Sequence, residues 1–111
     1  MSEEKETTAI SDEEVKKDYK AAGESQSATQ LPKIDFSMLI FSLNSSVMVH
    51  LGILEDPGTG QKVKNLPLAK QTIDILSMLE EKTRGNLTKQ EEEMLKHILY
   101  DLRLMYVKEA G

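Results

Sequence analysis

The residues with the clearest chemical potential lie in the stretch KTRGNLTKQEE at positions 82–92, which combines cations with hydroxyl, amide and glycine residues. Free N–H groups at a helix start attract phosphate, so one interpretation is a cradle for an anion. Against it, Glu91 and the two glutamates that follow would repel an anion. Gly85 can adopt the positive φ that ends a helix, and Thr88 with Glu91 matches a capping box for the next helix. We therefore favour a structural turn, which comprises Gly85, Asn86, Thr88 and Glu91.

The histidines are the next candidates for chemistry, as bases or as metal ligands. The chain has two, His50 and His97, and neither belongs to a His-x-x-x-His or Glu-x-x-His pair of the kind that converges on a metal. His50 falls on the apolar face of a predicted helix, where a lone histidine is expected to be a core residue. His97 falls on a charged side and is expected to be solvated. The sequence predicts no metal site.

Three charged residues are candidates for a catalytic role. Asp74 could act as a general base only if it were buried, but helical spacing places it on a polar face beside Lys70, where an ion pair is expected. Asp101 and Arg103 flank Leu102 and are expected to bridge to neighbouring helices or to a second subunit. The chain contains neither a serine or cysteine nucleophile motif nor a glycine-rich dinucleotide loop. We expect no catalytic residue, no cofactor and no enzymatic activity.

The composition supports one small domain. The 111 residues are 39% hydrophobic and 30% charged, as in a globular protein with a polar extension, and their formal charge is −5. An acidic chain has no electrostatic reason to approach nucleic acid or anionic lipid. No cysteine is present, and the N-terminus lacks the basic start and apolar segment of a secretory signal. We therefore expect a cytoplasmic protein without a nucleic-acid partner.

Residues 1–33 differ from the rest of the chain. They hold eight acids and five lysines among scattered apolar side chains, so they bury too little surface to offset chain entropy. The sequence predicts a disordered acidic tail, in which a capping signal at Ser11 favours a short helix over 11–22. This helix is either a docking segment for a partner or a marginal helix with none. In the first case the candidate docking residues are Val15 and Tyr19.

From residue 34 onward the pattern predicts an all-α domain, either a small three-helix bundle or a helical hairpin plus a helix. Asp35 is a good N-cap and Gly52 a good C-terminal stop for the first helix, and Pro67 suits the first turn of the second. The predicted helices span about 36–51, 67–83 and 89–109. Their predicted apolar faces are Phe36, Leu39, Ile40, Leu43, Val47 and Leu51; Leu68, Ala69, Thr72, Ile73, Ile75, Leu76 and Leu79; and Met94, Leu95, Ile98, Leu99, Leu102, Met105 and Tyr106.

The first of these helices has more apolar surface than its own chain can cover. No charged residue interrupts the sequence from Phe36 to Leu54, but serines, Asn44 and His50 dilute it and basic flanks are missing, so we expect a central helix and no membrane span. The third helix carries a second apolar patch near its end. Both features predict a homo-oligomer, most simply a two-fold dimer. The candidate interface residues are Phe41, Met48, Val49, Tyr100, Leu104 and Val107.

Two segments carry a resemblance to a known family. The pair LG at 51–52 and the stretch AKQTIDILSMLEEKTRGNLTKQEEEMLKHILYDLRLMY at 69–106 resemble the family known as domain of unknown function 1844. The resemblance covers about 36–106 and leaves the acidic tail outside. It implies a bacterial, all-helical and non-secreted domain, and it brings no established activity, cofactor or catalytic residue.

Two functions remain from these observations. The first is a non-catalytic homo-oligomeric interaction or assembly module. The alternative is a helical module that binds a small apolar ligand or lipid, because methionine side chains adapt to irregular apolar pockets. The methionines that would line such a pocket are Met38, Met48, Met78, Met94 and Met105.

Overall fold

The structure is a computed structural model that describes residues 11–25, 31 and 33–111. The chain divides into two compact units, Met1–Lys33 and Ile34–Gly111. Within the described residues the regular elements are four α-helices, and there is no strand. The all-α prediction is therefore confirmed.

The first unit contains helix α2, which spans Asp12–Ser25. Its start follows the predicted signal, because the Ser11 hydroxyl accepts a hydrogen bond from the Glu14 backbone N–H at 3.2 Å. The helix continues past Gly23, where we expected it to end. Gly23 does not adopt a positive φ, and a glycine within a helix costs only about 0.5–1 kcal/mol relative to alanine, so the helix can pass through it. The disordered tail predicted over residues 1–33 falls partly on residues 1–10, 26–30 and 32, which lie outside the described residues.

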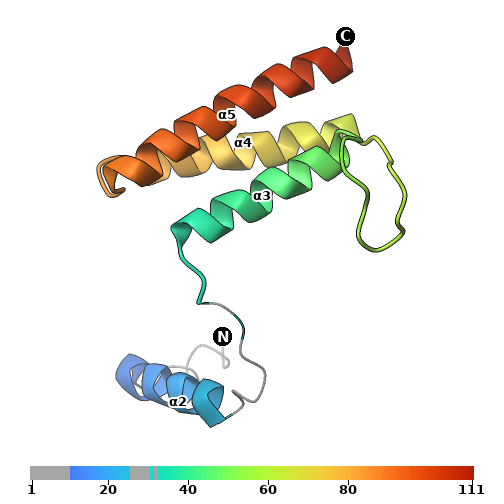
Figure 1. The fold of residues 1–111 in the computed structure, drawn as a ribbon. Helices are drawn as coiled ribbons and strands as arrows, with labels where there is room; N and C mark the ends of the chain where they lie inside the picture. Colours follow the sequence, from blue (N-terminus) through green and yellow to red (C-terminus); the bar gives the residue numbers. More distant parts are fainter. Residues whose placement is uncertain (1–10, 26–30, 32) are drawn as a thin grey trace, which may run out of the picture. The chain divides into compact units, whose positions relative to one another are not determined.

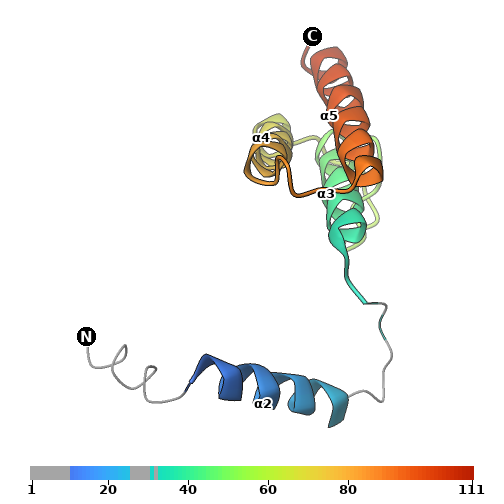
Figure 2. The same cartoon turned by 90° about the vertical axis from the view of Figure 1, so that its left-hand side faces the viewer.

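The second unit is a bundle of three helices, α3 (Phe36–His50), α4 (Leu66–Lys82) and α5 (Lys89–Ala110), and each helix packs against the other two. Figure 1 shows these helices alongside one another, and in Figure 2 the short turn between α4 and α5 faces the viewer. Each helix begins and ends within one residue of the predicted position.

Side chains cap the start of all three helices in the bundle. The Asp35 carboxylate accepts from the Met38 N–H at 2.9 Å, and the Asn65 side chain accepts from the Leu68 N–H at 3.1 Å. Thr88 caps α5. These bonds satisfy N–H groups that a helix leaves unpaired in its first turn, and they fix where each helix begins.

The long connection between α3 and α4 is held at its base. Gly52, at φ +79°, turns the chain after α3, and Leu51 and Lys64 form an isolated antiparallel bridge. The Asn65 N–H then donates to the His50 carbonyl at 2.7 Å. The Lys64 ammonium also lies 2.8 Å from the Glu109 carboxylate near the end of α5, so this ion pair ties the connection to α5.

The core lies where the three helices meet. Its buried apolar residues are Ile40, Val47, Leu51, Ala69, Ile73, Leu76, Leu95, Ile98, Leu99 and Leu102. Buried Thr72 satisfies its hydroxyl by donating to the Leu68 carbonyl at 3.0 Å. The predicted apolar face of α5 is confirmed. The buried face of α4 is rotated relative to the predicted apolar face, because Leu68 and Ile75 of that predicted face are each 38% exposed. The burial of Ile73, on the side of α4 nearer to α5, accounts for this rotation.

Candidate functional site

The turn between α4 and α5 uses its polar residues for structure. Gly85 has φ +83°, and the Asn86 N–H donates to the Thr83 carbonyl at 2.8 Å. The capping box is complete: the Glu91 N–H donates to the Thr88 hydroxyl at 3.1 Å, and the Thr88 N–H donates to the Glu91 carboxylate at 2.9 Å. A carboxylate of the chain itself therefore occupies a position that a bound anion would need.

The two histidines lie in different surroundings. His50 is half-buried at the end of α3 and, with Asp56, borders a shallow hollow of about 440 Å³ that is also lined by serines. His97 is largely exposed, as expected, and its Nε2 lies 3.1 Å from an oxygen of Asp101 on the next turn of α5. Within the described part of the chain, no group of three His, Cys, Asp or Glu residues is placed to hold a metal ion.

The charged residues that were candidates for catalysis form structural contacts. Lys70 Nζ lies 2.9 Å from Asp74 Oδ2 on the exposed face of α4, which confirms the predicted pair. The hydrogen bond that the Lys70 ammonium donates to the Asp74 carboxylate, together with the negative charge of that carboxylate, raises the pKa of Lys70 above its usual value. Arg103 joins two helices, because its Nη2 donates to the Ser77 hydroxyl of α4 at 3.1 Å. None of these contacts forms a nucleophile and base pair.

The first uncovered surface is the side of α3 that points away from the core, opposite Ile40 and Val47. We name it the α3 outer face and define it by the residues that helical spacing places there: Met38, Phe41, Ser42, Ser45 and Val49. Phe41 is 54% exposed and Met38 39%. The five residues of the face are uncharged, and Asp56 lies at its edge, where it borders the same hollow as Ser42, Ser45 and Val49.

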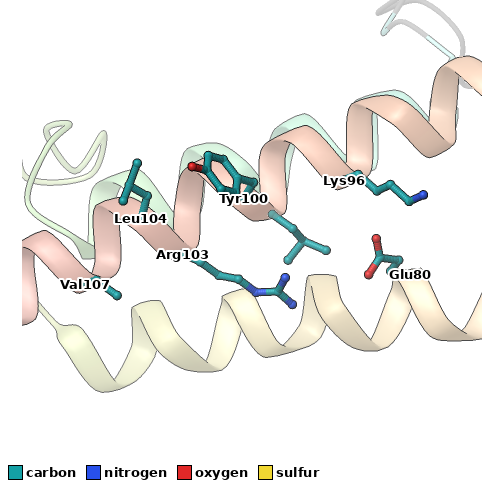
Figure 3. Close-up of a pocket in the computed structure, with 7 residues that line it drawn as sticks. Glu80, Lys96, Tyr100, Arg103, Leu104 and Val107 are labelled. Carbon is teal, nitrogen blue, oxygen red and sulfur yellow. The ribbon is translucent and has the colours of Figure 1, made fainter.

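The second uncovered surface is a groove along α5 that reaches toward α4. We name it the α5 groove. It encloses about 310 Å³ and is lined by Glu80, Lys96, Leu99, Tyr100, Arg103, Leu104 and Val107. Tyr100 and Val107 are 66% and 65% exposed. Figure 3 shows Arg103 extending from α5 toward α4, where Glu80 points back toward α5.

The predicted interface residues thus divide between two surfaces. Tyr100, Leu104 and Val107 line the α5 groove together. Phe41 and Val49 belong to the α3 outer face, whereas Met48 is half-buried and packs against the core. The sequence predicted that Arg103 bridges to a neighbouring helix, which its bond to Ser77 confirms. It did not indicate Lys96 beside the groove, although Lys96 lies one turn before Tyr100.

The methionines considered for an apolar pocket are spread over the bundle. Met48, Met94 and Met105 pack against the core, while Met38 and Met78 are exposed. None of them lines the α5 groove. Among the helices that the structure describes, none combines the length and the hydropathy that crossing a bilayer requires.

The fold and its surfaces define a small all-helical domain in which the polar contacts described above cap, pair and connect helices. The chain belongs to the family described as Domain of unknown function (DUF1844), whose model matches residues 33–108. This match includes α3, α4 and all but the last two residues of α5, and it confirms the resemblance seen in the sequence. Neither the curated proteins nor the solved structures include a match to the chain.

Proposed function

We propose that the protein is a non-catalytic interaction module that forms a two-fold homodimer through the α3 outer face, in the cytoplasm of a bacterium. The observation that carries the proposal is the exposure of Phe41 and Met38 on a helix with no charged residue. Water contact with such side chains is unfavourable, and aromatic residues and methionine are enriched at protein interfaces.

Charge supports a second copy of the same chain as the partner. Each chain has a formal charge of −5, so two copies repel one another over most of their surface. The α3 outer face reduces this repulsion at the point of contact, because its own five residues are uncharged and Asp56 lies only at its edge. A two-fold axis brings the same patch of both copies together, which suits a patch whose central residues are uncharged.

The test is sedimentation equilibrium of the full chain and of two variants at about 20 μM, a concentration at which micromolar association is visible. We expect the unmodified chain to show twice its 12.5 kDa mass. Phe41→Asp should weaken the dimer more than about 100-fold, because it removes roughly 100 Å² of aromatic surface per subunit and places a carboxylate in the interface.

Tyr100→Asp is the matched control, because it changes an exposed aromatic residue on α5 in the same way. We expect this variant to remain dimeric. If Tyr100→Asp dissociates the dimer and Phe41→Asp does not, the α5 groove is the contact between subunits and the proposal for α3 is wrong. A single-chain mass for the unmodified protein would remove the homodimer altogether.

A further inference from the structure

The α5 groove has an apolar centre with two cations beside it. Tyr100, Leu104 and Val107 follow the i, i+4, i+7 spacing, which places them in one line along α5. Leu99 is buried beneath this line, and the cations are Lys96 and Arg103. From Lys96 to Val107 the groove follows three turns of α5, a length of about 16 Å at the rise of an α-helix.

The two cations have no acidic partner within the bundle. Among the described residues, neither Lys96 nor Arg103 forms an ion pair, and Glu80 on the α4 side lies beyond ion-pair distance of both. Arg103 uses one Nη2 hydrogen bond to Ser77, which holds the guanidinium at the groove and leaves further N–H donors available. The groove is thus locally basic on a chain whose overall charge is negative.

We propose that the α5 groove binds an amphipathic helix of a partner protein, with acidic residues beside its apolar stripe. The apolar line of the groove matches a helix whose own apolar residues recur at i, i+4 and i+7. Acidic side chains on that helix would pair with Lys96 and Arg103, which lie seven residues, or about 10 Å, apart along α5.

Other occupants fit the groove less well. Two cations with Glu80 nearby offer few contacts to a nucleic-acid backbone, which needs clustered Lys and Arg. Pairing of two copies through this groove would place two cations and one carboxylate from each copy in the contact, which leaves a net charge of +2 there. The proposal goes beyond the homodimer, because the groove does not share a residue with the α3 outer face.

The probe is a synthetic 18-residue helical peptide with leucines at i, i+4, i+7 and i+11 and glutamates beside them. A matched peptide carries lysines in place of the glutamates. Fluorescence anisotropy with the full chain should give a Kd below about 100 μM for the glutamate peptide, and binding at least about 10-fold weaker for the lysine peptide. The glutamate peptide should also shift the amide resonances of residues 96–107.

Charge reversal provides the sharper test. The double variant Lys96→Glu with Arg103→Glu should reverse the preference and bind the lysine peptide more tightly. The matched control, Lys62→Glu with Lys89→Glu, gives the same net charge of −9 but changes exposed residues outside the groove, and it should keep the original preference. If circular dichroism shows that the charge reversal alters the fold, a second double variant, Lys96→Gln with Arg103→Gln, takes its place. This variant should reduce the preference for the glutamate peptide at least about 5-fold.

Three results would overturn the proposal: no saturable binding of the glutamate peptide, equal binding of both peptides, or the same change of preference in the control variant. The homodimer is tested separately, because peptide binding by the Phe41→Asp variant should match that of the unmodified chain. An unmodified chain that is dimeric but shows no peptide preference would refute the groove proposal alone. An unmodified chain that is monomeric but prefers the glutamate peptide would refute the homodimer alone.

Discussion

Replacing Gly85 with alanine isolates the backbone conformation of the α4–α5 turn. Gly85 has φ +83°, and a Cβ atom built there meets no other atom within 4 Å. The substitution therefore introduces no clash with neighbouring side chains. Its effect on stability comes from the left-handed conformation itself, which an L-residue adopts at a cost of about 1–2 kcal/mol.

The expected magnitude includes an opposing contribution from the unfolded chain. Alanine has fewer unfolded conformations than glycine, which recovers about 0.4–1 kcal/mol. The free energy of unfolding should therefore fall by roughly 0.8 kcal/mol in Gly85→Ala, which is the difference between the midpoints of these two ranges. Gly85→Asn should lose less, because asparagine tolerates the left-handed region better than alanine.

Urea unfolding at 25 °C, followed by circular dichroism at 222 nm, measures this difference. With a slope of about 1–2 kcal/mol/M for a small domain, the Gly85→Ala midpoint should fall by roughly 0.5 M. The reasoning is refuted if Gly85→Ala is as stable as the unmodified chain, or if Gly85→Asn is the less stable variant. Stabilisation by millimolar phosphate at constant ionic strength, lost on Gly85→Ala, would instead support the anion-site interpretation.

Further predictions concern three other features of the bundle. Thr88→Ala removes the N-cap of α5 and should lower the free energy of unfolding by about 1 kcal/mol in urea; no change would show that the cap is not formed. Leu76→Ala opens a cavity at a fully buried position and should cost about 2–5 kcal/mol by the same measurement, so a loss below about 1 kcal/mol would contradict this core. Lys64→Gln removes the ion pair to Glu109 and should cost less than about 1 kcal/mol, with the difference vanishing in 1 M NaCl because both side chains are partly solvated.

The ends of the helices were predictable because their signals are local. The backbone N–H that donates to the Asp35 carboxylate belongs to the residue three positions later. Thr88 and Glu91 likewise have the spacing of a capping box. The start of α4 was less clear, since Pro67 suggested the first turn while Asn65 provides the cap. The sequence interpretation used only Pro67, and the cap at Asn65 was not predicted, although an N-cap at Asn65 and a proline in the first turn are compatible signals.

The rotation of the helices depends on contacts between distant segments, and local spacing does not determine it. Ile73 and Ile75 both lie on the apolar side of α4, but only Ile73 is buried, because α5 packs on that side. The pairing of Lys64 with Glu109 joins residues far apart in the sequence for the same reason. The α5 groove likewise needed the placement of Glu80 from a second helix, so the sequence indicated its apolar residues but not its shape.

The central claim is that a neutral helix face holds two copies of the chain together. Sedimentation equilibrium of the unmodified chain at 50 mM and 500 mM NaCl tests it most directly, because screening weakens contacts between charges and leaves apolar contacts in place. We predict a dimer at both salt concentrations, with a dissociation constant that does not rise with salt. A chain that sediments at 12.5 kDa throughout, or a dimer that dissociates as salt is added, would contradict the account.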